Sequence, residues 1–222
     1  MSSFPHRLPN RVVREANLAV ADKLFLLHGL TWRRRYRDDS GKEQKSSQEF
    51  VGWNSHLAIR NLGISRQRPY RKILATLDFL KIHKVQYRGR DHLQISLFNS
   101  ISEMTYFYCP QEVFDLELTP SEKLGLIVAF MLRDQSSYQL RSKSSFIDEL
   151  GRCLHLTSRQ SQRVKRTLVE QEFLRETPIA GKASTFEMLP HPSFSMGWES
   201  LVKSEPVPKA SSIPSLHLIK TA

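Results

Sequence analysis

The 222-residue chain lacks the features that mark several large protein classes. Cysteine is scarce: Cys109 and Cys153 are the two present, with no CxxC pair and no histidine cluster nearby, so neither a disulfide framework nor a structural zinc site is predicted. Both thiols are expected to be buried as small apolar groups. No apolar run approaches the length of about 18 residues that a membrane span needs, and the first residues lack a signal peptide's apolar core. We expect a cytoplasmic protein without a membrane partner.

Motifs of the common enzyme classes are also missing. The sequence contains no GxxxxGK[ST] and no GxSxG, so ATP hydrolysis and serine-hydrolase chemistry have no support. Its eight histidines are scattered, and the adjacent pairs Asp38–Asp39 and Asp148–Glu149 point apart on a strand or helix, which fits no metal site. We therefore expect a protein that is not an enzyme and that has no cofactor and no metal.

Basic residues are in excess, and the excess is confined to one half. The chain has 33 Lys and Arg against 22 Asp and Glu, a net charge of +11. Residues 1–99 hold 19 basic and 8 acidic side chains, whereas residues 100–222 hold 14 of each. A hydrophobic content of 40% is typical of a globular protein with a real core. A basic domain favours polyanions, with nucleic acid and anionic membrane surfaces as the main candidates.

The second half resembles the first at an offset of 100 residues. Residues 18–27 align with residues 118–127, and the leucines, an acidic residue and a lysine coincide. A start signal precedes the apolar residues in each copy: Asp22 in the first, and the run 119–122, with Pro at the first helical position, in the second. The pattern predicts one amphipathic helix packed on a core in each half.

A polar stretch, 31–52, leads into a helix-turn-helix pattern in the first half. Asn54 or Ser55 is expected to cap a helix that ends at the turn residue Gly63, and Ser65 to cap the next helix. Pro69 is tolerated there because it falls in the first turn. The apolar stripe predicted for this second helix is Tyr70, Ile73, Leu74, Leu77 and Leu80.

The second half repeats the plan after the polar stretch 133–144. Ser145 is expected to cap a helix that runs to Leu154, and Thr157 or Ser158 to open the next. The tripeptide Ser-Arg-Gln occurs at 65–67 and at 158–160, and we expect these copies at matching places. The second turn is expected to be one residue longer than the first, and it has no glycine.

A strand-turn-strand pattern follows each pair of helices. In the first half, residues 84–87 and 93–97 flank the turn 88–91. In the second half, residues 174–177 and 186–189 flank a turn around Gly181 and Lys182. Three helices followed by a hairpin is the winged-helix order.

In this order of elements the chain resembles tandem winged-helix DNA-binding proteins, and it is closest in plan to plasmid replication initiators. The resemblance covers about residues 10–190 and is carried mainly by residues 57–66 and 80–82. It implies an α+β, mainly helical fold with two winged helix-turn-helix domains in tandem. Their bounds would be an extension at 1–10, a basic domain at 11–99, a second domain at 100–190, and a Pro/Ser-rich, partly disordered tail at 191–222.

The resemblance also implies origin recognition on double-stranded DNA by a nucleoid-associated protein. In the major groove, Arg pairs with guanine and Gln with adenine, and a wing arginine suits a phosphate backbone or the minor groove. The predicted DNA-binding residues are Arg66, Gln67, Arg68, Tyr70, Arg71, Lys72, Arg88, Arg90, Arg159, Gln160, Gln162, Arg163 and Arg166. The basic run 33–37 adds phosphate-type charge. The structural alternative for all of them is a solvated charged face.

Other functions and partners stay open. The chain could act as a transcriptional repressor that binds a palindrome as a dimer with itself, or as a winged-helix protein-interaction subunit of a larger DNA-processing complex. Replication partners would be a helicase or the sliding clamp. Residues 94–98 resemble a clamp-binding pentapeptide, but their alternation also suits a wing strand. In the tail, Phe194, Met196 and Trp198 are candidates to anchor its first part on the second domain.

Overall fold

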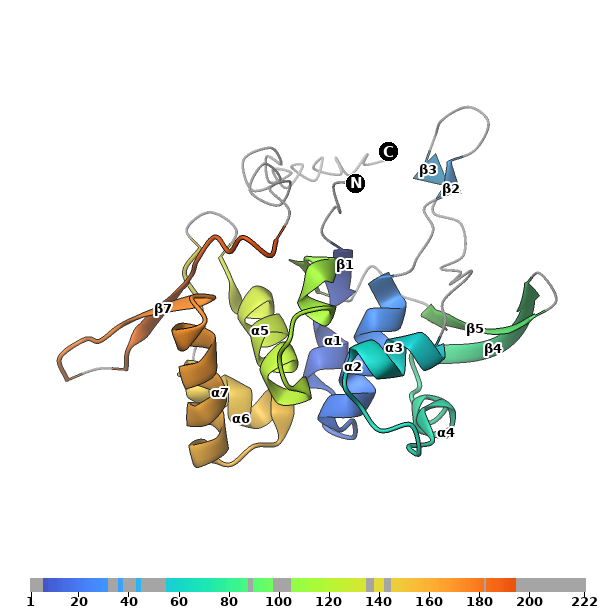
Figure 1. The fold of residues 1–222 in the computed structure, drawn as a ribbon, viewed down its shortest axis with the longest axis horizontal. Helices are drawn as coiled ribbons and strands as arrows, with labels where there is room; N and C mark the ends of the chain where they lie inside the picture. The colour runs from blue at the N-terminus through green and yellow to red at the C-terminus, as the bar shows by residue number, and fades with distance from the viewer. Residues whose placement is uncertain are drawn as a thin grey trace, which may run out of the picture.

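A computed structural model describes residues 6–31, 36–37, 43–44, 55–87, 90–97, 105–134, 138–141, 145–181 and 183–194 (Figure 1). The fold is mixed α+β and mostly helical, with small two-stranded sheets. Within these ranges no helix is long and apolar enough to cross a bilayer.

The first half begins with a strand and ends with a long hairpin. Its elements are β1 (His6–Pro9), α1 (Asn10–Arg14), α2 (Val20–Thr31), β2 (Tyr36–Arg37), β3 (Glu43–Gln44), α3 (Ser55–Asn61), α4 (Tyr70–Leu74), β4 (Leu80–Tyr87) and β5 (Arg90–Leu97). The second half has the same order without the small β2–β3 ladder. Its elements are β6 (Tyr106–Cys109), the 3-10 helix η1 (Gln111–Phe114), α5 (Pro120–Leu132), α6 (Phe146–Leu154), α7 (Ser158–Glu170), β7 (Leu174–Thr177) and β8 (Thr185–Met188).

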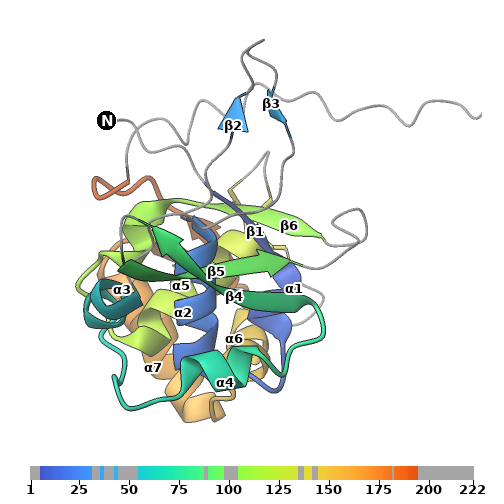
Figure 2. The same cartoon turned by 90° about the vertical axis from the view of Figure 1, so that its right-hand side faces the viewer.

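The two central helices, α2 and α5, are buried along nearly their whole length. Every residue from Asp22 to Thr31 and from Lys123 to Leu132 is buried. The expectation of two amphipathic helices is therefore wrong. The two helices pack against each other, and other elements of both halves cover their remaining sides (Figures 1 and 2). A helix that is apolar on all sides suits this central position.

The two halves are related by an approximate two-fold rotation. β1 and β6 lie 100 residues apart in sequence and pair antiparallel, so that His6 faces Cys109 and Leu8 faces Phe107. α2 and α5 also begin 100 residues apart and pack side by side. Contacts in which the same surfaces of two copies meet are the mark of two-fold symmetry. The repeat is thus arranged face to face rather than in a row.

Two lysines at equivalent positions each donate a hydrogen bond to a carbonyl in the other half. Lys23 Nζ in α2 donates to the carbonyl of Cys153 near the end of α6, at 2.6 Å, and to that of Val13, at 2.8 Å. Lys123 Nζ in α5 donates to the carbonyl of Asn61 at the end of α3 and to that of Phe114, both at 2.8 Å. Each ammonium therefore satisfies a terminal carbonyl of a helix in the other half.

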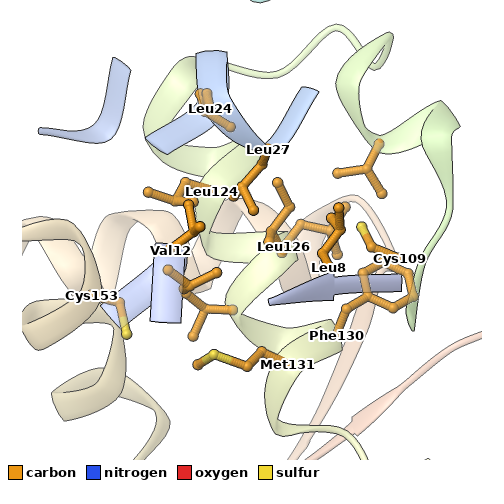
Figure 3. Packing of buried hydrophobic residues seen from close by; sticks show 14 of the residues in the cluster. Leu8, Val12, Leu24, Leu27, Cys109, Leu124, Leu126, Phe130, Met131 and Cys153 are labelled. Carbon is orange, nitrogen blue, oxygen red and sulfur yellow. The ribbon is translucent and has the colours of Figure 1, made fainter. Parts of the chain in front are cut away.

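One hydrophobic cluster extends across both halves. Figure 3 shows Leu8 of β1, Leu27 of α2 and Leu126 of α5 close together in it. Cys109 and Cys153 belong to the same cluster as buried free thiols, as the sequence predicted.

The predicted tail is described only as far as Phe194. This residue is buried, and its ring lies 5.6 Å from that of Phe130, between centroids, so the first part of the tail is anchored on α5. The other two anchor candidates, Met196 and Trp198, lie outside the described residues.

The helix-turn-helix turns of the two halves have the same form. Gly63 (φ 67°) and His155 (φ 55°) both adopt the left-handed conformation. In each turn the next amide bonds the carbonyl five residues back, from Ile64 to Ile59 and from Leu156 to Gly151. The turn in the second half is therefore not longer, and a histidine takes the place of the glycine.

This equivalence corrects the alignment of the repeated tripeptide. If Gly63 matches His155, then Ser65 matches Thr157, and the two Ser-Arg-Gln copies are out of register by one residue. The register changes again further on, because Tyr70 stacks on Phe25 and Val164 faces the equivalent Gly125, a spacing of 94 residues instead of 92. The second half has two more residues between the turn and this point.

Several predicted boundaries also shift. α4 spans only five residues, because residues 66–69 form turns rather than its first helical turn, and Leu80 opens β4 instead of ending the helix. The hairpin strands β4 and β5 extend further than predicted and pair from Leu80 with Leu97 to Tyr87 with Arg90. The second hairpin lies close to its predicted bounds.

Candidate nucleic-acid interface

Helix α7 presents the best-defined basic surface among the described residues. Thr157 caps its start through a capping box: the Thr157 hydroxyl accepts from the Gln160 amide, and the Gln160 side chain accepts from the Thr157 amide. The buried side chains are Ser161, Val164 and Leu168, at the spacing of a single helix face. Nearby residues therefore determine both where α7 starts and which side faces the core.

The opposite face of α7 carries the predicted contact residues. Arg159, Gln162, Arg163 and Arg166 are all exposed. Among the ion pairs of the described residues, none involves these three arginines, although Glu149, Glu176 and Glu187 each pair with another cation. The face thus offers positive charge and planar donors to an external polyanion.

Close packing holds α7 against α5. At Gly125 of α5, an added Cβ would lie 2.6 Å from a γ-methyl group of Val164. Real Cβ atoms do not approach other carbons this closely, so the absence of a side chain at Gly125 permits the contact. The equivalent position in α2 is Phe25, which stacks on Tyr70 at a centroid distance of 4.4 Å. The helix after the turn therefore approaches the central helix more closely in the second half.

An ion pair connects α7 to the hairpin that follows it. Lys165 Nζ donates to Glu176 of β7 at 2.6 Å, and both side chains are partly buried. Lys165 precedes Arg166 in the helix, so this contact fixes β7 alongside the basic face. No local sequence signal indicates the role of Lys165, because its partner lies 11 residues away in a different element.

In the first half, the predicted residues divide between surface and core. Arg66 and Gln67 are exposed in the turn before α4, and Lys72 is exposed on α4. These three are available to a ligand, but Arg66 and Gln67 are not presented by a helix. Among the side chains that the structure describes, the short α4 therefore presents a smaller exposed basic surface than α7.

Arg68 has a structural partner. Its guanidinium makes two bonds to the buried carboxylate of Asp22, at 2.5 and 2.6 Å, and this hydrogen bonding raises the pKa of Arg68. Asp22 Oδ2 also accepts from the Ala19 amide and so caps α2. Arg68 thus ties the loop before α4 to the start of α2. Sequence reasoning identified Asp22 as a helix start signal but missed its pairing with Arg68, since 46 residues separate the two.

Tyr70 is part of the core rather than the surface. It is 4% exposed, its ring stacks on Phe25, and its hydroxyl donates to the Ser65 carbonyl at 2.9 Å. Burial also raises the pKa of its phenol. We therefore leave Tyr70 out of the candidate interface.

Some predicted residues lie where the structure gives no side-chain description. Arg71 in α4 and Arg90 in β5 have backbone positions only, and Arg88 lies outside the described residues. Within the basic run 33–37, the backbone of residues 36–37 alone is described, in β2. In the clamp-like segment 94–98, residues 94–97 are paired with β4, and residue 98 is outside the described part.

Across the described ranges, no group of three or more His, Cys, Asp or Glu side chains is arranged to hold a metal ion. The candidate interface consists of exposed arginines and the exposed Gln162 amide on α7. Comparisons with protein-family models, curated proteins and solved structures find no match for this chain.

Proposed function

We propose that the chain is a sequence-specific double-stranded DNA-binding protein built from two winged helix-turn-helix units, and that it acts without catalysis. The exposed face of α7 carries the proposal. Its arginines recur at helical spacing on a helix that follows a tight turn, as recognition helices do. Exposed arginine and amide groups of this kind suit base edges in the major groove and flanking phosphates.

The hairpin after α7 supports the same interpretation. In a winged-helix unit, a hairpin follows the recognition helix and lies beside the bound duplex. Here the ion pair of Lys165 with Glu176 joins β7 to α7. The first half supplies exposed Arg66, Gln67 and Lys72 from the equivalent region.

The biological role we propose is origin recognition during replication of a plasmid or mobile element. This part rests on the resemblance in element order to plasmid initiators. A replicative helicase or the sliding clamp would then be the protein partner. Two linked reading elements strengthen binding through effective concentration, and the basic first half adds a salt-sensitive phosphate contribution.

The test is selection of duplexes from a random pool by the full chain at near-physiological salt, where non-specific phosphate binding is suppressed. We expect enrichment of one site bound by one chain. A palindrome bound by two chains would favour the repressor role instead. No enrichment of any duplex would overturn the proposal.

A charge-matched pair of variants locates the surface. The double substitution Arg159→Ala and Arg163→Ala should weaken binding to the selected duplex, by about 1 to 3 kcal/mol for each arginine that reads a base. The control is Arg7→Ala with Arg60→Ala, which removes the same charge from exposed positions in β1 and α3. Equal weakening by the two variants would remove α7 from the reading surface.

A further inference from the structure

The first four residues of the connection between β7 and β8 are uncharged and exposed. Residues 178–181, Pro-Ile-Ala-Gly, are all exposed and carry no charge. Ile179 is 39% exposed, and it is the one exposed large hydrophobic residue among those whose side-chain burial is described, which excludes β4 and β5. Lys182, next in sequence, lies outside the described residues. An apolar side chain exposed at the end of a hairpin is unfavourable in water and becomes more favourable when it is covered.

The β7–β8 hairpin is held to the rest of the molecule at the end opposite this connection. Phe186 of β8 is buried and lies 5.2 Å from Phe146 of α6, between ring centroids. The backbone of residues 138–140 bonds β8 from its other edge, through Leu140 to Phe186 at 2.8 Å and Met188 to Tyr138 at 2.9 Å. Together with the Lys165–Glu176 ion pair, these bonds fix the direction of the hairpin. Figure 1 shows it projecting from one end of the molecule, beyond α7.

The first hairpin has a tip of different chemistry. Its two-residue connection, Arg88 and Gly89, is followed by Arg90 at the start of β5, and these two arginines suit phosphate contact through charge. The second connection, residues 178–184, has one charged residue, Lys182, after an uncharged run at 178–181 that includes the exposed Ile179. The two hairpins therefore suit different ligand surfaces, a polyanionic backbone for the first and an apolar surface for the second.

We propose that Ile179 enters the minor groove and inserts between two stacked base pairs beside the segment that α7 reads. This inference rests on the proposed function. Stacked base faces are the apolar surface that lies next to a basic helix docked on a duplex. Small apolar side chains inserted at a base step unstack it and kink the duplex toward the major groove. The anchored base of the hairpin supplies the stiffness that such insertion requires.

The experiment uses the selected duplex with 2-aminopurine, an adenine analogue whose fluorescence rises when it unstacks, placed at each step in turn. Binding of the full chain should raise the 2-aminopurine fluorescence at one base step at the edge of the site. Ile179→Ser should abolish this signal, whereas Ile179→Leu, which keeps an apolar side chain of equal size, should retain it. Because Ile179 makes no contribution to the buried core, both variants should unfold like the parent chain.

The outcomes separate the two proposals. Binding of the duplex without brightening at any step, or equal brightening by the Ile179→Ser variant, overturns the insertion and leaves DNA binding intact. The first of these results would point to a protein partner for the tip. If no duplex is selected at all, DNA binding and insertion both fail.

Discussion

Lys23 and Lys123 are 100 residues apart, and each ammonium bonds a helix-terminal carbonyl in the opposite half of the chain. Both side chains are almost completely buried, at 0% and 2% exposed, and burial lowers the pKa of each. The bonds come in pairs, one to the lysine's own half and one across. They fasten the halves to each other at two equivalent points.

Replacing either lysine with methionine should destabilise the whole chain. Lys23→Met leaves the Val13 and Cys153 carbonyls without this donor, and a buried unsatisfied group costs about 1 to 3 kcal/mol. Chemical denaturation should show a lower midpoint for Lys23→Met and for Lys123→Met, with one transition rather than two. Lys72→Met, at an exposed position, is the control and should change little. Two separate transitions in the parent chain would contradict the single core.

Gly125→Ala should destabilise the packing of α7 against α5. The new methyl group would lie 2.6 Å from Val164, and overpacking of a core costs about 1 to 3 kcal/mol, against a stabilisation of about 1 from helix propensity. Adding Val164→Ala should restore part of the stability by opening space. Gly151→Ala is the matched helical control, since its nearest atom would be 3.4 Å away. A Gly125→Ala variant more stable than the parent would contradict the close packing.

At the two turn residues with positive φ, introducing glycine and removing glycine should change stability in opposite directions. His155→Gly should stabilise the chain by up to about 1 kcal/mol, because glycine adopts positive φ without steric cost. Gly63→Ala should destabilise it by a similar amount through the same conformation. Thermal unfolding of both variants checks the pair. The same sign of change in both would contradict equivalent turns.

Substitution of Arg68 should lower stability, whereas substitution of Arg66 should weaken DNA binding. Arg68→Met removes both guanidinium bonds to buried Asp22. A cost of about 1 to 3 kcal/mol is expected, less than for a fully buried pair because the Arg68 side chain is 36% exposed. Arg66→Met should leave stability within about 0.5 kcal/mol and weaken binding to the selected duplex. The comparison needs denaturation and duplex titration of both variants.

His28 should make the chain sensitive to mild acid. It lies edge-on to Phe114, and burial, aided by Lys123, lowers its pKa to about 4. The unfolded chain then binds a proton at this site as the pH falls below about 6.5, whereas the folded chain stays neutral there until about pH 4. Stability from this group is therefore complete above pH 6.5 and falls by about 3 kcal/mol toward pH 4.

The measurement is the free energy of unfolding between pH 7 and pH 5, where most carboxylates have not begun to titrate. His28→Leu should flatten this part of the profile relative to the parent chain. Identical slopes for the two proteins would mean that His28 titrates normally in the folded state.

Local patterns predicted local structure well. Ser145 and Thr157 cap α6 and α7 where their sequence signals stand, and the alternating residues of the second hairpin form β7 and β8. Capping and turn formation depend on residues a few positions apart, so the sequence contains them directly.

The same reasoning failed where residues far apart in the sequence contact each other. The ion pair of Arg68 with Asp22 gives a predicted contact residue a structural role. Tyr70 was predicted both for the apolar stripe and for DNA contact, and its stacking on Phe25 places it in the core. α2 and α5 looked amphipathic because their few polar residues were assigned to solvent, whereas Lys23 and Lys123 point into the opposite half. These outcomes depend on how the halves meet, which no local pattern encodes.

The crossing lysines also bear on how the chain is made. The partners of Lys123 precede it in the sequence, but Lys23 must wait for Cys153, which is synthesised 130 residues later. Until residues 120–132 have been synthesised, α2 exists on the ribosome without α5, which covers part of it in the finished molecule. The N-terminal half of this protein therefore completes its core only after part of the C-terminal half has been made, against the usual order in which the first part synthesised folds before the next appears.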